Sequence, residues 1–311
     1  MTQSGSLPAP QDISDAAALL ADHIRTTPVV EVDAADLGVV DGPGSLQLKL
    51  ELLQQSGTFK ARGAMHALLR SPPAADGVVA ASGGNHGVAV AWAAGRLGMP
   101  AHIFVPEVSA PAKVERLRSL GAQVHQIGSE YVEALEASME FVEQHDVVTV
   151  HAYDQFEVMA GAGTMSRELA RQAAPDTVVM SCGGGGLSGG AARWFGGQVR
   201  LIVVETELTP TYASAVAAGE PVDVDVSGVG ADALGARRLG ALGWQALSSV
   251  GAESALVTDD EVLDAMAGLW ETCRLRVEPA AAAALAALRS GRVAIEPDER
   301  VAVVICGANV A

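Results

Sequence analysis

Residues 177–195 read Thr-Val-Val-Met-Ser-Cys-Gly-Gly-Gly-Gly-Leu-Ser-Gly-Gly-Ala-Ala-Arg-Trp-Phe. The apolar run over 177–181 predicts a short buried strand, and the segment 188–195 predicts a helix. Between them lie four consecutive glycines, 183–186, which let backbone N–H groups converge on an anion at the N-terminus of the helix. A strand-to-helix turn without a ligand needs only one or two glycines. The stretch therefore predicts an α/β fold with a phosphate-binding loop.

Strands and helices alternate on both sides of this loop. Short apolar runs predict strands, and apolar residues at helical spacing predict helices. The predicted strands are residues 78–81, 101–105, 123–127, 147–150, 199–204 and 301–305, and the predicted helices are residues 12–24, 88–97, 111–120, a part of 131–144, and 259–274. Short apolar strands separated by helices indicate parallel sheets covered by helices. A length of 311 residues favours two domains.

Composition narrows the possible partners and the compartment. The chain has 37 acidic residues against 20 lysines and arginines, and the net charge of −17 would repel nucleic acid and anionic membrane surfaces. Cys182, Cys273 and Cys306 are odd in number and lack the spacing of a metal site. The N-terminus lacks a signal-peptide pattern, and no apolar run reaches membrane-spanning length. We therefore expect a cytoplasmic protein with reduced thiols that binds neither nucleic acid nor membrane.

The chain has three lysines, Lys49, Lys60 and Lys113, and the second lies in Ser-Gly-Thr-Phe-Lys-Ala-Arg-Gly-Ala, residues 56–64. A lysine amine can lose its proton and act as a nucleophile, which an arginine cannot do. Local spacing alone leaves an ordinary surface lysine as an equal alternative. A reactive lysine together with a phosphate-binding loop is the pair of features that pyridoxal phosphate requires, because the amine holds the aldehyde and the loop holds the phosphate.

A nicotinamide cofactor is the competing interpretation of the loop. Gly184, Gly186 and Gly189 satisfy the dinucleotide pattern G-x-G-x-x-G, and Glu205 ends the next predicted strand. Against an NAD-dependent dehydrogenase, the loop lies late in the chain and no residue is evidently placed for hydride transfer. A Walker loop is excluded because the chain has no Gly-Lys-Ser or Gly-Lys-Thr. A binding protein without catalytic activity is a further alternative.

Six motifs, in this order, resemble those of the fold-type II pyridoxal-phosphate enzymes, in the branch of serine and threonine dehydratases and serine racemase. They are the lysine segment 56–64, Ser-Gly-Gly-Asn-His-Gly at 82–87, Ala-Gly-Ala-Gly-Thr at 160–164, the loop 183–187, Glu278-Pro279, and Cys-Gly-Ala-Asn at 306–309. The resemblance implies a two-domain, tryptophan synthase β-like architecture. A large cofactor domain would comprise residues 1–66 and 153–311, and an inserted small domain, residues 67–152, would carry the Ser-Gly-Gly-Asn-His loop.

The resemblance also implies a role for each matched residue. Lys60 would form the Schiff base with pyridoxal phosphate and remove the Cα proton of the substrate. Phe59 would pack near the ring, Asn85 would donate to its phenolic oxygen, and Cys306 would face its pyridine nitrogen. The phosphate would be bound by Gly183, Gly184, Gly185, Gly186 and Leu187, and the substrate carboxylate by Ser82, Gly84, Asn85 and His86. From its position ahead of Pro279 alone, Glu278 is expected to cap the helix that follows, with at most an indirect role in the site.

These roles favour an ammonia-lyase. A neutral thiol opposite the pyridine nitrogen cannot stabilise a protonated ring as a carboxylate would, which favours rapid loss of a β-substituent. We expect β-elimination of water from L-threonine or L-serine, giving a 2-oxo acid and ammonia, in a homodimer. The alternatives are serine racemisation and dehydration of another β-hydroxy amino acid. Gly83 disfavours racemisation because the racemases carry a serine there as a second base. We expect no metal, because Thr211 stands where a second carboxylate would be required.

Overall fold

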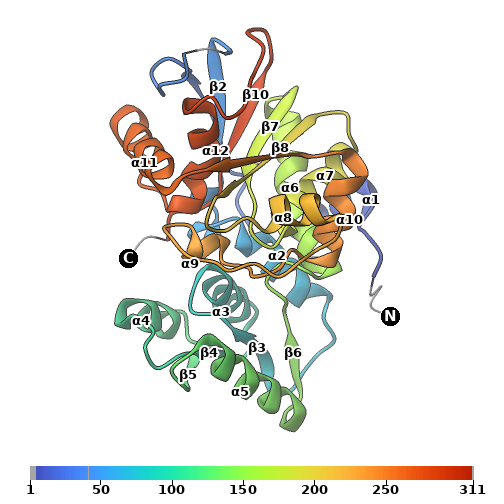
Figure 1. The fold of residues 1–311 in the computed structure, drawn as a ribbon. Helices are drawn as coiled ribbons and strands as arrows, with labels where there is room; N and C mark the ends of the chain where they lie inside the picture. The colour runs from blue at the N-terminus through green and yellow to red at the C-terminus, as the bar shows by residue number, and fades with distance from the viewer. Residues whose placement is uncertain (1–4, 41, 310–311) are drawn as a thin grey trace.

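The computed structural model describes residues 5–40 and 42–309, and it contains two sheets (Figure 1). The first has the strand order β1-β2-β10-β7-β8-β9, and only the β1–β2 pair is antiparallel. Its strands are β1 (Val29–Asp33), β2 (Ser45–Leu50), β7 (Thr177–Ser181), β8 (Arg200–Thr206), β9 (Glu253–Val257) and β10 (Val301–Ile305). The second, with the order β5-β4-β3-β6, is parallel throughout. It contains β3 (Gly77–Ala81), β4 (Ala101–Val105), β5 (Gln123–Gln126) and β6 (Val147–Thr149).

Helices cover both sheets, which confirms the predicted fold class. The long helices are α1 (Pro10–Leu19), α2 (Lys60–Arg70), α3 (Asn85–Leu97), α4 (Pro111–Ser119), α5 (Tyr131–Gln144), α6 (Phe156–Gln172), α7 (Gly186–Phe195), α8 (Thr211–Ala218), α10 (Ala241–Val250), α11 (Asp259–Cys273) and α12 (Pro279–Arg289), and α9 (Ala231–Leu234) is short. Figure 1 shows the smaller sheet with α3, α4 and α5 as a separate layered body below the larger one. The domain boundaries given above remain a prediction, and the boundary at 66/67 lies inside α2.

Two predicted helices have ends that differ from the structure, each for a physical reason. The helix expected over 12–24 spans Pro10–Leu19. It begins earlier because proline suits the first helical position, where no N–H is needed, and it ends at the cap residue Leu20. The helix expected from residue 188 begins at Gly186, so part of the glycine loop is already helical. The other predicted elements are present with ends displaced by a few residues at most.

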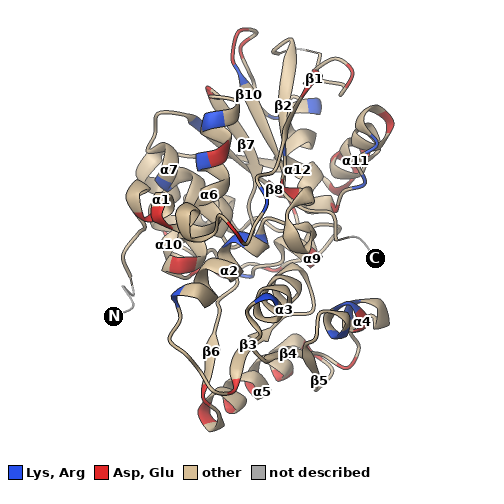
Figure 2. Ribbon diagram, turned by 180° about the vertical axis from the view of Figure 1, so that it is seen from behind, with Lys and Arg blue, Asp and Glu red and all other residues tan. Residues whose placement is uncertain are grey.

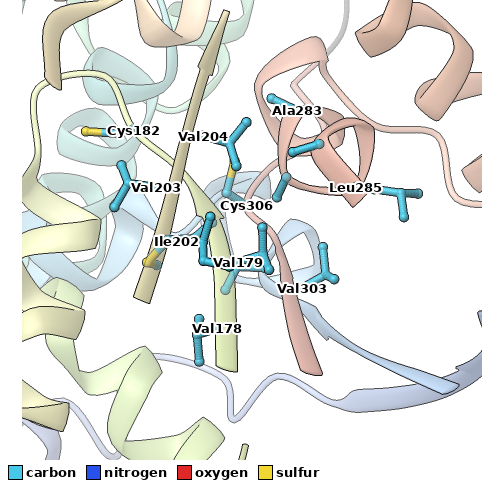
Figure 3. Close-up of a cluster of buried hydrophobic side chains, with 14 of the residues drawn as sticks. Val178, Val179, Cys182, Ile202, Val203, Val204, Ala283, Leu285, Val303 and Cys306 are labelled. Atoms are coloured by element: carbon cyan, nitrogen blue, oxygen red, sulfur yellow. The ribbon is translucent and has the colours of Figure 1, made fainter. Parts of the chain in front are cut away.

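The larger core lies between the six-stranded sheet and its helices. Strands β7 and β10 are buried along their whole lengths, and so is α12 from Ala280 to Leu288. Figure 3 shows Ala283 and Leu285 of α12 in the same buried cluster as Val178, Val179 and Val303 of the sheet. Alanines at these positions let the helix axis approach the strands closely, and each buried valine or leucine contributes about 1.5–3 kcal/mol.

Charged residues lie mainly on the outside of the molecule. Figure 2 shows acidic residues along α5 and a basic cluster on α4, which includes Arg116 and Arg118. None of the described helices is long and apolar enough to cross a membrane. The carboxyl ends of parallel strands are the usual location of ligand sites in α/β proteins. Here they bring together the loops that follow β3, β7 and β10.

Candidate active site

A cavity between the two bodies gathers every residue predicted to contact the cofactor. Phe59 and Lys60 lie at the start of α2, the loop 183–187 follows β7, and Cys306 follows β10. All of them line the cavity, together with Asn85 from the first turn of α3. The structure thus assembles one site from segments that are far apart in the sequence. The roles of the individual residues stay predictions.

The amine of Lys60 faces this cavity. Its Nζ donates to the carbonyl of Ala152 at 2.6 Å and lies 5.2 Å from the centroid of the Phe59 ring. Burial lowers the pKa of Lys60 to about 8, against the opposing influence of Cys306 and Glu278. About a tenth of the side chains are therefore neutral at pH 7, far more than for an exposed lysine. Such an amine is suited to attack an aldehyde or to accept a proton.

A buried ionic network holds helix α2, and therefore Lys60, in place. Arg62 is fully buried and donates from Nε to Glu51 at 2.7 Å and from Nη1 to Glu168 at 2.7 Å. Lys49 donates to the same Glu168 at 2.9 Å. Two cations and two carboxylates balance in charge, as a buried network requires. Lys49 is therefore a structural lysine. The third lysine, Lys113, lies outside this network and pairs with Asp232 at a distance of 2.5 Å.

The glycine loop offers unpaired donors where a phosphate would bind. The backbone N–H groups of Gly184, Gly186 and Leu187 donate to no other group within the described residues. Gly185 has a φ of 86°, a conformation that favours glycine. A Cβ atom added to Gly184 would lie 2.2 Å from the ring of Tyr153. The donor set and the absence of side chains fit a phosphate group, and the nearby amine of Lys60 fits an aldehyde, so the site fits pyridoxal phosphate.

Glu205 is not placed to bind a ribose, which is the role that a dinucleotide-binding fold would give it. The carboxylate is fully buried and accepts from the Tyr212 and Ala213 backbone N–H groups at 2.8 and 2.9 Å. Burial raises the pKa of Glu205 to about 7. The hydroxyl of Thr211 lies 2.6 Å from both Glu205 and the carbonyl of Gly183. The carboxylate therefore supports the back of the loop and is not available to a ribose.

The substrate loop, residues 82–86, which was predicted to bind the substrate carboxylate, is only partly directed into the cavity. Asn85 lines it, whereas the hydroxyl of Ser82 accepts from the backbone of Gly84 at 3.3 Å. His86 contacts the carbonyl of Val150 at 2.8 Å through Nε2. Burial, followed by the charge of Lys60, lowers the pKa of His86 to about 3, so the ring is neutral. A neutral ring held by a backbone carbonyl suits a positioning role better than that of a base.

Glu278 stands at the N-cap position of α12, but its side chain turns into the site, and the expected indirect role stays a prediction. Its side chain makes no capping hydrogen bond to α12. Instead it lines the cavity and accepts from Asn85. Burial raises the pKa of Glu278 to about 7. Burial and the nearby charge of Glu278 also raise the pKa of Cys306 well above its usual value, so Cys306 stays a neutral thiol.

The segment 151–154 belongs to the site although no sequence motif predicted it. Ala152 accepts from Lys60, and the ring of Tyr153 covers Gly184. Asp154 accepts from the backbone N–H groups of Ala241 and Leu242 at the start of α10, at 3.0 and 2.9 Å. No spacing pattern links residue 153 to residue 184. Only the position of this segment, between a predicted strand and the motif at 160–164, could have pointed to it.

Comparison with known proteins agrees with this geometry. Residues 20–307 match the family model of the pyridoxal-phosphate dependent enzymes. Phenylserine dehydratase from Ralstonia pickettii is 35% identical over 99% of this chain and 96% of its own length. L-threonine ammonia-lyase from Geobacter sulfurreducens is 36% identical over 80% of this chain, which spans only 63% of that protein. The structure of maize serine racemase superposes with a TM-score of 0.91 at 28% identity, covering 98% of this chain and 95% of that one.

Proposed function

This chain belongs to the pyridoxal-phosphate-dependent enzyme family, and we propose that it removes water from L-threonine or L-serine by β-elimination. The products would be ammonia and a 2-oxo acid, formed when loss of water is followed by hydrolysis. The single observation that carries the proposal is the meeting of three groups in one cavity: the amine of Lys60, the loop 183–187 and the neutral thiol of Cys306. The relatives named above support the reaction type.

The chain's own residues account for most of the chemistry required. When bound, pyridoxal phosphate supplies an electron-accepting ring that makes the Cα hydrogen of an amino acid acidic. The amine of Lys60, with its pKa of about 8, is suited to accept that proton. Cys306 offers no carboxylate to stabilise a protonated pyridine nitrogen, which favours early loss of the hydroxyl group. The unpaired N–H groups of the loop would hold its phosphate.

Absorbance and product release test the proposal together. Purified protein should be yellow, and the visible band should disappear in the Lys60→Ala variant. Release of a 2-oxo acid should be measured with L-threonine, L-serine and D-serine, with Lys113→Arg as a control that changes a part-exposed lysine outside the cavity. A colourless protein that binds NAD, or a yellow protein inert towards every β-hydroxy amino acid, would contradict the proposal.

The second candidate function is dehydration of a β-hydroxy amino acid with a larger group on Cβ, favoured by the match over 96% of the length of phenylserine dehydratase. Racemisation is less favoured because Gly83 has no side chain that could exchange a proton. A Cβ added there would meet Val105 Cγ1 at 3.4 Å and Ser109 Oγ at 3.9 Å, which are ordinary contact distances, so the position has room for a Cβ atom. Adding 3-phenylserine to the product assay, and following D-serine formation from L-serine, distinguishes these activities from the main proposal.

We also propose that the enzyme is a cytoplasmic homodimer. Its three cysteines are free, as expected in a reducing compartment. Leu263 and Trp270 on α11 are 47% and 51% exposed, and Trp270 borders an apolar groove formed with Met266 and Val277. Light scattering should give twice the mass of one chain, and Trp270→Glu should reduce it to the mass of one. A wild-type mass of one chain would refute the dimer.

A further inference from the structure

The side-chain amide of Asn85 is held at both ends by residues from the other body of the molecule. Its Nδ2 donates to Oε1 and Oε2 of Glu278 at 2.9 and 3.0 Å. Its Oδ1 accepts from Nδ2 of Asn309 at 2.9 Å, and the same nitrogen donates to the carbonyl of Ser56 at 3.1 Å. Asn85 begins α3, whereas Glu278 precedes α12 and Asn309 follows β10. The network therefore joins the substrate loop to the segment that carries Lys60.

These contacts allow only one orientation of the Asn85 amide. Rotation by half a turn would place its oxygen against the carboxylate of Glu278 and its nitrogen against the amide nitrogen of Asn309. The first contact would join two acceptors and the second two donors. Both sets of groups are part-buried, so water could replace the lost bonds only incompletely. The network thus selects the orientation with nitrogen towards Glu278.

Counting hydrogens shows what this orientation leaves for a ligand. The amide nitrogen carries two hydrogens that point in widely different directions, whereas the two oxygens of one carboxylate lie side by side. A single hydrogen is therefore shared between Oε1 and Oε2 of Glu278. The second hydrogen of Asn85 remains available in the cavity that it lines with Lys60. Only an acceptor, such as a phenolic oxygen, can receive it.

Glu278 is an unusual residue for a purely structural position. It is 5% exposed and forms no salt bridge among the described residues. A buried carboxyl group without a direct ion pair destabilises the fold unless its hydrogen bonds and the nearby charge of Lys60 compensate. A glutamine would present one acceptor oxygen with less desolvation, but it could not accept with both. The second oxygen is what makes the contact to Asn85 symmetrical and leaves its other hydrogen free.

We propose that Glu278 is a positioning residue for the β-elimination reaction, acting through Asn85. It fixes one amide N–H of Asn85 towards the cavity, where the phenolic oxygen of a bound cofactor could accept it, and with Asn309 it holds the loop of residues 82–86 close to Lys60. This inference rests on the proposed function and adds a residue to it. Loss of Glu278 should release the amide, remove a donor from the phenolic oxygen and change the visible absorption of the cofactor.

Three variants of the cofactor-loaded enzyme test the proposal. Glu278→Ala should still bind pyridoxal phosphate, because Lys60 and the glycine loop are unchanged. Its visible band should shift, and kcat for the preferred β-hydroxy amino acid should fall about 10-fold or more with a smaller change in KM. Glu278→Gln retains one acceptor oxygen but loses the symmetrical contact, so its spectrum and rate should lie between those of Glu278→Ala and the parent. Glu271→Ala, which removes an exposed carboxylate from α11, should behave like the parent.

The outcomes separate this inference from the proposed function. A parent enzyme without a visible cofactor band or without elimination activity would overturn the proposed function itself. An active parent whose spectrum and kcat are unchanged by Glu278→Ala would overturn the positioning role. If circular dichroism shows that Glu278→Ala does not fold, Glu278→Gln and Asn309→Ala are compared instead. Asn309→Ala should then shift the visible band, and unchanged spectra in both variants would refute the proposal.

Discussion

Replacing Arg62 by alanine should lower the stability of the protein by several kcal/mol. Arg62 makes two bonds to Glu51, at 2.7 and 2.8 Å, and two to Glu168, at 2.7 and 2.9 Å. Its removal leaves two carboxylates beside one cation, Lys49, and Glu51 has no exposed surface. Breaking a buried ion pair in this way costs about 3–5 kcal/mol. For a protein of this size the corresponding fall in Tm is roughly 6–20 °C.

A matched arginine supplies the control for this prediction. Arg300 makes a similar two-bond contact to Asp176, at 3.0 and 2.7 Å, but both side chains are about half exposed. Arg300→Ala should leave Tm nearly unchanged because water screens and replaces an exposed pair. Adding Glu51→Gln to Arg62→Ala should recover part of the loss by neutralising the unpaired carboxylate. Differential scanning calorimetry measures all four proteins. Equal effects of Arg62→Ala and Arg300→Ala would refute the reasoning.

The remaining predictions concern the site. Gly184→Ala should weaken cofactor binding, measured by absorbance titration, because the new methyl group would lie 2.2 Å from the Tyr153 ring. The control is Gly44→Ala, whose methyl group would meet nothing within 4 Å, and equal cofactor affinities of the two variants would show that the ring does not cover the loop. Gly83→Ser should gain measurable racemisation of L-serine without unfolding, since its Cβ contacts are no closer than 3.4 Å; an unchanged D-serine yield would contradict the role assigned to this position. The rate of pyridoxal phosphate uptake by cofactor-free protein should rise about 10-fold per pH unit up to pH 8 and then level off, because the Lys60 amine must be neutral to react and its pKa is about 8. A rate that levels off only above pH 10 would refute the lowered pKa.

Helix α6 shows why some elements were not predicted from the sequence. Gly161 and Gly163 lie in its middle, and glycines in such a segment are usual signals of a loop. Both are required by packing: a Cβ on Gly161 would lie 2.6 Å from the carbonyl of Arg62, and one on Gly163 would lie 2.8 Å from Ile13. The helix is therefore stabilised by close contacts with its neighbours, which outweigh the low intrinsic propensity of glycine.

The sequence alone determined the features that depend on local pattern and order. Apolar runs and helical spacing predicted the alternating strands and helices, and the glycines at 183–186 predicted a phosphate loop. The order of the motifs predicted the family, which the match over residues 20–307 confirmed. These features are readable because backbone geometry, turn chemistry and anion binding are governed by residues adjacent in the chain.

Only the tertiary structure decided which groups meet. Residue 153 covers residue 184, Glu278 reaches Asn85, and Arg62 joins Glu51 to Glu168. Each contact connects different elements, so it depends on how helices and sheets pack and not on spacing along the chain. The same packing lowers the pKa of Lys60 to about 8 by desolvation, which no sequence pattern encodes. The glycine loop identifies the kind of ligand, whereas the packing around it determines the chemistry that the ligand meets.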